Sequence, residues 1–162
     1  MNFIENLNIT NRRVLIRVDF NVPMENREVS NDFRIKKSLD TINYCLDNNA
    51  SVILMSHLGR PKGESNPEFS LEGVSFCLEE LLNREVMFVD DCVSEEAFTI
   101  SKNIKSQEVL LLENLRFHKG EEENNDAFSK KLSEHADVYI NDAFGTAHRS
   151  HSSNVGVLSH FR

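Results

Sequence analysis

The chain lacks the surplus of positive charge that a general nucleic-acid-binding surface requires. Its 162 residues include 26 acidic and 18 basic side chains, which gives a net charge of −8 at pH 7. Domains that bind DNA or RNA normally show a basic excess or a basic stripe. The charge balance therefore argues against nucleic acid as a partner. A few clustered arginines could still make the potential positive locally and bind a small anion.

Cysteine is scarce, and no apolar run approaches the length of a membrane span. Cys45, Cys77 and Cys92 are odd in number and have no C-x-x-C spacing, which suits a reducing cytoplasm. Crossing a bilayer takes about 20 consecutive apolar residues. Matches to the glycosylation acceptor pattern at 8–10 and 49–51 are attributed to chance, because no signal peptide is present. We expect a cytoplasmic protein with no membrane partner.

The common nucleotide-binding and hydrolase motifs are absent as well. The sequence contains no G-x-x-x-x-G-K-[ST] segment and no G-x-G-x-x-G segment after a strand, so no phosphate cradle of either kind is expected. It contains no serine nucleophile elbow. No internal repeat or low-complexity linker interrupts the chain, whose length fits one domain with a sizeable core.

What is present is a regular alternation of apolar strand-like runs and amphipathic helical segments. Strands are expected at 13–19, 51–56, 85–89, 108–113 and 137–143. Helices are expected from a cap at 30–32 to 48–49, and at 71–82, 94–103 and 126–135. A polar excursion or short hairpin is expected at 24–30, a Gly/Pro-rich loop at 57–69 and an acidic loop at 118–126. This alternation predicts βαβ units, and hence a Rossmann-like parallel α/β sheet with helices on both faces.

The strand-like runs end in loops that carry Arg, Asn or His. The residues that follow the first, second, fourth and fifth runs include Asp19, Asn21, His57, Arg60, Asn114, Arg116, Asn141, Asp142, His148 and Arg149. In an open parallel sheet, ligands bind outside the carboxyl ends of the strands. If these loops share one edge, they form a basic pocket for a small phosphorylated acid.

Two of these loops place an arginine in a restricted setting. Gly59 allows a turn with positive φ and Pro61 stiffens the exit, so that Arg60 has a preset direction suited to forked binding of phosphate. The alternative is a surface loop whose arginine forms a local ion pair. Leu115 and Phe117 are expected to be buried in the core, so that the Arg116 side chain between them points away from it. The alternative is an exposed surface arginine between two core residues.

Polar groups near the first strand have two interpretations each. Asp19 and Asn21 could accept from a substrate hydroxyl or orient an arginine, or they could be a turn-forming pair before Pro23. Arg34 lies in the first turn of a helix, where the helix dipole disfavours a cation. An anionic partner would explain why an arginine stands at this helix start. The alternative is that Arg34 is an ordinary solvated residue.

Histidines near the end of the chain raise the question of a metal site. His148, His151 and His160 are close in sequence, but no carboxylate or cysteine completes a ligand set. Arg149 stands between two of them, which disfavours a cation. We expect no metal site, and we interpret His148 as a hydrogen-bonded structural residue. The run 121–123 of three glutamates is expected to be a solvated loop face.

Four segments together resemble the N-terminal half of the phosphoglycerate kinase family. They are Arg17 to Pro23 (RVDFNVP), Ser56 to Pro61 (SHLGRP), Leu112 to Phe117 (LENLRF) and Asn141 to Ser152. They occur in the order and at the spacing of the family, and the match covers essentially the whole chain.

The resemblance implies a glycolytic enzyme that reversibly transfers a phosphoryl group from 1,3-bisphosphoglycerate to ADP, giving 3-phosphoglycerate and ATP. By the family pattern, the substrate-binding residues are Arg17, Asp19, Phe20, Asn21, Arg34, His57, Leu58, Gly59, Arg60, Arg116 and Arg149. Arg34 faces the end where the phosphoryl group moves and is the candidate catalytic residue. His57, Arg60, Arg116 and Arg149 hold the phosphate that is not transferred.

The resemblance also implies a monomer with two α/β lobes that close about a hinge. Residues 1–162 are expected to be the N-terminal, phosphoglycerate-binding lobe. The C-terminal lobe, which binds Mg²⁺ with ATP or ADP, has no counterpart in this sequence, so the chain is expected to be inactive alone. The alternative is a non-catalytic module that keeps the fold and binds a phosphorylated ligand. A metal- or nucleic-acid-binding domain fits neither the charge nor the ligand spacing.

Overall fold

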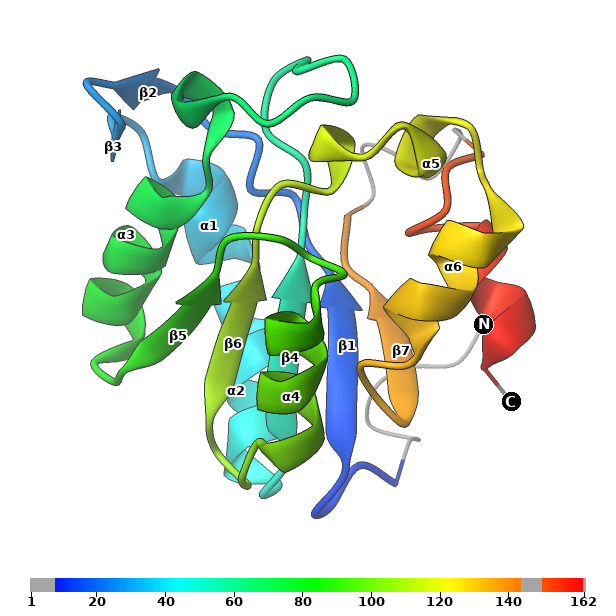
Figure 1. The fold of residues 1–162 in the computed structure, drawn as a ribbon. Helices are drawn as coiled ribbons and strands as arrows, with labels where there is room; N and C mark the ends of the chain where they lie inside the picture. Colours follow the sequence, from blue (N-terminus) through cyan, green and yellow to red (C-terminus); the bar gives the residue numbers. More distant parts are fainter. Residues whose placement is uncertain (1–7, 144–149, 162) are drawn as a thin grey trace.

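Five parallel strands form one sheet through the middle of the molecule. The computed structural model describes residues 8–143 and 150–161. The strands are β1 (Arg13–Arg17), β4 (Ser51–Met55), β5 (Val86–Val89), β6 (Val109–Leu112) and β7 (Val138–Asn141). Their order is β5-β6-β4-β1-β7, and every neighbouring pair is parallel. Their carboxyl ends therefore meet at one edge, toward which all five arrows point in Figure 1. The expected parallel α/β sheet is confirmed.

Helices cover both faces of this sheet because successive strand residues point to opposite sides. On β1, Val14 and Ile16 belong to the first hydrophobic core, whereas Leu15 belongs to the second. The first core is closed by α1 (Phe33–Lys37), α2 (Leu39–Asp47) and α3 (Glu72–Leu82), and the second by α4 (Glu95–Asn103) and α6 (Asp126–Ser133). In Figure 1, α4 and α6 lie in front of the sheet and α2 lies behind it.

The helix expected between the cap at 30–32 and residues 48–49 is divided at Ser38 into α1 and α2. The Ser38 amide and hydroxyl both donate to the carbonyl of Ile35, at 3.1 and 2.7 Å. The regular pattern resumes when the Ile42 amide donates to the Ser38 carbonyl at 3.1 Å. A serine hydroxyl that competes for a nearby carbonyl tightens the helix locally, which apolar periodicity does not reveal.

Short elements fill the connections. The expected hairpin at 24–30 is present as β2 (Met24–Glu25) paired with β3 (Glu28–Val29). The single-turn helices are η2 (Pro67–Phe69), η3 (Leu115–Phe117) and η5 (Gly156–His160). The segment expected to be an acidic loop contains the short helix α5 (Lys119–Glu122). Within residues 8–143 and 150–161, no helix combines the length and the apolar character needed to cross a membrane.

The chain connections diverge at the carboxyl ends of β4 and β6. These strands are neighbours, but β4 leads to α3 on the first core and β6 leads to α6 on the second. Ligands in open α/β sheets bind where adjacent strands send their connections to opposite faces. The fold thus brings the loops that begin at His57 and Glu113 to the position where a ligand site is expected.

Candidate active site

Asn114 locks together the loops that follow β4 and β6. Its side-chain amide donates to the carbonyls of Leu58 and Phe69 at 2.7 and 2.9 Å. Its Oδ1 accepts from the amides of Leu58 and Arg116 at 3.3 and 3.0 Å. With 1% of its surface exposed, Asn114 is a buried polar group whose donors and acceptors are satisfied. It sets the distance between the two loops that carry His57 and Arg116.

Arg34 is joined to the loop after β1, as one of the interpretations of Asp19 and Asn21 predicts. Its Nη1 donates to the Asn21 carbonyl at 2.8 Å and lies 3.5 Å from Asp19 Oδ2. Asn21 Oδ1 in turn accepts from the Gly59 amide at 2.9 Å. The Arg34 side chain remains 51% exposed, so these contacts orient its guanidinium without removing it from solvent.

Phe20 and Leu58 are buried beneath the site. Their relative exposures are 0% and 4%, and the Phe20 amide donates to Ser56 Oγ at 2.9 Å. Their side chains belong to the first core. The structure therefore brings them to the same edge as the other candidate residues, but as buried supports of the loops rather than as groups open to a ligand.

Arg17 is a fully buried cation at the end of β1. Only 1% of its surface is exposed, and burial lowers the pKa of its guanidinium. Its Nε donates to Ser153 Oγ at 2.9 Å, and Nη2 lies 2.8 Å from His57 Nδ1. A guanidinium can only donate hydrogen bonds, so Nδ1 must be the acceptor. This arrangement assigns His57 the neutral form with its proton on Nε2.

Glu121 departs from the expectation of a solvated glutamate run. It has no exposed surface, and its carboxylate accepts from both the amide, at 2.8 Å, and the hydroxyl of Ser153. Its own carbonyl accepts from the Ser152 amide at 2.9 Å. The prediction was wrong for Glu121 because a buried Arg17 needs a nearby negative charge, and Ser153 links the two. Glu122 and Glu123 are exposed, as expected.

Arg116 and Arg60 occupy different environments on neighbouring loops. Arg116 is 4% exposed and its Nη1 donates to the Gly59 carbonyl at 3.3 Å, so the alternative of an exposed surface arginine is wrong. Gly59 has the expected positive φ of 62°, and a Cβ there would lie 2.4 Å from the Phe69 ring. Arg60 is exposed beyond this turn.

Some candidates were missed by sequence reasoning or lie outside the described residues. Arg149 and His148 fall within 144–149 and lie outside that part of the chain.

Glu113 was missed as a functional support: its carboxylate accepts from Ser70 Oγ and the Leu71 amide, both at 2.7 Å. Burial raises the pKa of this carboxyl. Nothing local marks Glu113 or Ser153 in the sequence, because their partners come from distant segments.

Comparisons with known proteins show the family to which this chain belongs. The family model for phosphoglycerate kinase matches residues 4–162. Phosphoglycerate kinases of Finegoldia magna and Thermosipho africanus are 53% and 51% identical over 156 and 157 residues, which are 95% and 97% of this chain but 40% and 39% of those proteins.

Solved structures give the same result. The phosphoglycerate kinase of Coxiella burnetii superposes with a TM-score of 0.87 at 40% identity, over 98% of this chain and 39% of that one. The enzyme of Pyrococcus horikoshii OT3 does so with a TM-score of 0.87 at 37% identity, over 96% and 40%. The chain spans about two fifths of the length of these relatives. It belongs to the phosphoglycerate kinase family.

Proposed function

We propose that this chain is the phosphoglycerate-binding lobe of a phosphoglycerate kinase, which transfers a phosphoryl group reversibly between 1,3-bisphosphoglycerate and ADP. The observation that carries the proposal is a chain of hydrogen bonds at one strand edge, from Arg34 to Asn21, from Asn21 to Gly59 and from Gly59 to Arg116. At the same edge, His57 is hydrogen-bonded to the buried Arg17. The whole protein would be a cytoplasmic monomer with a second lobe.

The charges at this edge suit an anion that is held at both ends. The phosphate that is not transferred would be bound by Arg60, Arg116, His57 and Arg149. Arg17 would orient the His57 ring through its hydrogen bond to Nδ1. Arg34 would face the transferring group. Phosphoryl transfer depends on positioning and on stabilising charge rather than on covalent help. A preoriented guanidinium serves this purpose because it need not reorganise during the reaction.

The edge does not fit a magnesium–nucleotide site. Mg²⁺ prefers carboxylate and water oxygens, whereas this edge offers mainly guanidinium and amide groups, and its Asp19 carboxylate is already next to Arg34. Mg²⁺ with ATP or ADP would therefore be bound by the second lobe, and the lobe formed by this chain would not catalyse the reaction alone.

Binding by the chain itself is tested by isothermal titration with 3-phosphoglycerate. Arg60→Ala should weaken binding about ten-fold or more, since a hydrogen bond to a charged group contributes roughly 1.5–3 kcal/mol. Arg34→Ala should weaken it less, because the product lacks the phosphoryl group that this residue would face. Arg12→Ala, at the opposite edge of the sheet, is the matched control. Equal affinity of the wild-type and Arg60→Ala chains would contradict the assignment of the phosphate site.

A chimaera separates a catalytic lobe from the alternative, a non-catalytic phospho-ligand module. This chain would replace the matching 156 residues of the Finegoldia magna relative, which supplies the rest of the protein. The chimaera should form ATP from 1,3-bisphosphoglycerate and ADP. Arg34→Ala should lower its kcat about 100-fold or more, the usual cost of losing a preorganised charge-stabilising donor. A folded chimaera that binds 3-phosphoglycerate without turnover would favour the non-catalytic module.

A further inference from the structure

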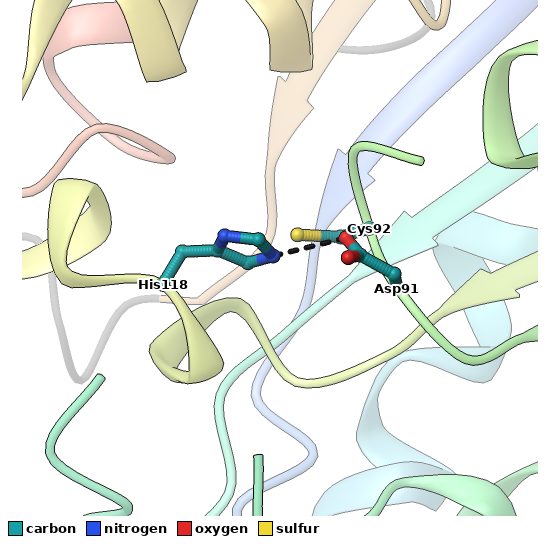
Figure 2. Close-up of side chains that lie close together, drawn as sticks. All are labelled: Asp91, Cys92 and His118. Carbon is teal, nitrogen blue, oxygen red and sulfur yellow. Dashed lines mark hydrogen bonds and ion pairs between the residues drawn. The ribbon is translucent and has the colours of Figure 1, made fainter. Parts of the chain in front are cut away.

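A sulfur, a nitrogen and an oxygen donor meet in a cluster that the proposed phosphoryl transfer does not use. Asp91 and Cys92 follow β5, and His118 lies between η3 and α5. One ligand atom from each of the three side chains lies within 4.8 Å of the other two, and Asp91 Oδ1 is 2.9 Å from His118 Nε2. Figure 2 shows the thiol and the carboxylate turned toward the imidazole ring.

The fold holds each of these side chains in place. Asp91 Oδ1 also accepts from the Val93 amide at 2.9 Å. The Cys92 carbonyl lies 2.7 Å from His135 Nε2, and the His118 ring stacks on Phe128 with centroids 5.3 Å apart. Such supporting contacts orient ligands and raise the affinity of a metal site. These contacts restrain the Asp91 carboxylate, the His118 ring and the backbone of Cys92.

The three donor side chains differ in their exposure to solvent. Cys92 is 1% exposed, whereas the side chains of His118 and Asp91 are 31% and 41% exposed. An ion could enter from solvent past the partly exposed imidazole and carboxylate, and the buried thiol would bind it from the protein side. Donor atoms around tetrahedral zinc lie roughly 3.3–3.8 Å apart, given metal–ligand distances of about 2.0–2.3 Å. The imidazole and carboxylate would have to separate by less than about 1 Å.

We propose that Asp91, Cys92 and His118 bind a Zn²⁺ ion, with water in the fourth position. Thiolate, imidazole and carboxylate are the donors that zinc takes in proteins. On binding, the Cys92 thiol releases its proton to solvent. The proton that His118 Nε2 donates to Asp91 leaves this nitrogen, with Nδ1 carrying the remaining ring proton, and the freed Nε2 lone pair bonds the ion. The ion would tie the loop after β5 to the segment that follows Arg116.

The structure contains a matched pair that lacks the thiol. His160 Nε2 lies 3.0 Å from Asp126 Oδ1, so this second histidine–aspartate pair repeats the contact of His118 with Asp91. Cys77 provides a control for adventitious thiol binding, because it is partly exposed and lies on α3. His160→Asn and Cys77→Ala should therefore leave metal binding unchanged.

Titration of the reduced chain with Co²⁺ tests the site. A cobalt–thiolate bond gives a sulfur-to-metal charge-transfer band, which should saturate at one ion per chain and disappear when Zn²⁺ is added. Cys92→Ala should abolish the band, and Asp91→Asn and His118→Asn should each weaken Co²⁺ binding about ten-fold or more. Both control variants should keep it.

The titration can overturn the proposal. It does so if the wild-type chain gives no charge-transfer band, or if the band survives Cys92→Ala. Cys92 lies in the second core, so the fold of that variant is checked by circular dichroism. If it does not fold, the partly exposed Asp91 and His118 decide the question, because unchanged Co²⁺ affinity in both variants excludes them as ligands.

Discussion

The buried guanidinium of Arg17 shows how a single residue organises this site. It touches Ser153 on one side and His57 on the other, and the Glu121 carboxylate contacts the same serine hydroxyl. An uncompensated buried charge is strongly destabilising. The Glu121 charge therefore offsets the desolvation of Arg17, and through Arg17 it supports the orientation of the His57 ring.

Glu121→Gln should lower the free energy of unfolding by about 2–4 kcal/mol, because it leaves the buried Arg17 charge without the buried carboxylate that compensates it. The measurement is urea denaturation followed by circular dichroism. Glu122→Gln is the control, since it changes the same residue type one position along at an exposed site and should change stability by less than about 0.5 kcal/mol. Equal stability of the two variants would show that Arg17 does not depend on Glu121.

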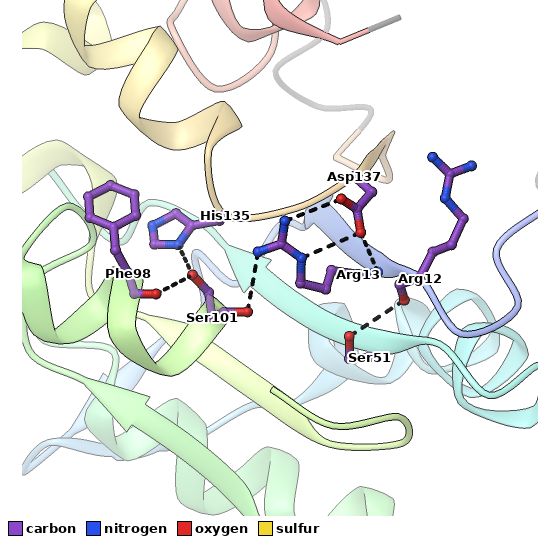
Figure 3. A network of polar contacts seen from close by, with 7 residues as sticks. All are labelled: Arg12, Arg13, Ser51, Phe98, Ser101, His135 and Asp137. Atoms are coloured by element: carbon purple, nitrogen blue, oxygen red, sulfur yellow. Dashed lines mark hydrogen bonds and ion pairs between the residues drawn. The ribbon is translucent and has the colours of Figure 1, made fainter. Parts of the chain in front are cut away.

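At the scale of helices and strands, a second polar network joins several elements at the opposite edge of the sheet. It lies near the amino ends of β1 and β7 (Figure 3). Arg13 donates to Asp137 at 3.2 Å and to the Ser101 carbonyl at 3.4 Å. Burial raises the pKa of Asp137, but the hydrogen bonds and charge of Arg13 outweigh it and hold that pKa below its usual value. The network joins α4, β1 and the connection from α6 to β7.

His135 makes this network sensitive to acid. Its Nδ1 lies 2.8 Å from Ser101 Oγ, its ring stacks on Phe98, and burial lowers its pKa to about 4. Because an unfolded histidine titrates near 6.5, the unfolded state binds the proton first. The stability contribution is complete above pH 6.5 and should fall by up to about 1.4 kcal/mol per pH unit between 6.5 and 4.

The measurement for this prediction is urea denaturation of wild-type chain and His135→Gln at several values of pH between 4.5 and 7. The difference in unfolding free energy between the two chains should shrink as the pH falls, because only the wild-type chain loses the histidine contribution. Comparing the two chains cancels the carboxyl groups that they share. A difference that stays constant with pH would show that His135 is not responsible.

At the scale of the whole molecule, one sheet serves two cores. Neighbouring residues Leu110 and Leu111 on β6 are both fully buried, yet Leu111 belongs to the first core and Leu110 to the second. Because the same strands contribute side chains to both cores, a strand that leaves the sheet is lost from both cores at once. We therefore expect both faces to unfold in a single cooperative step, as small domains commonly do.

The two tyrosines report separately on the two faces, since the chain has no tryptophan. Tyr44 packs against the first core and Tyr139 against the second. In Tyr139→Phe and Tyr44→Phe chains, the remaining tyrosine fluorescence should follow the same urea transition as circular dichroism. Leu110→Ala and Leu111→Ala should each lower stability by about 2–5 kcal/mol and shift both probes together. Separate midpoints for the two tyrosines would mean that the faces unfold independently.

Local patterns were sufficient for the strands, for most of the covering helices and for the grouping of polar loops at one edge of the sheet. Strands buried on both faces appear as continuous apolar runs, and the polar residues after them mark the shared carboxyl edge. The motif around Gly59 also predicted its left-handed backbone, because only the local chain sets that turn.

Pairings between distant segments depended on the folded arrangement. The burial of Glu121, the contact of Arg17 with Ser153 and the meeting of Asp91 with His118 each join residues from separate elements. Hydropathy patterns record how much of each residue faces water, but they carry no information on strand order. The order β5-β6-β4-β1-β7 decides which loops become neighbours, and so which charges are buried together.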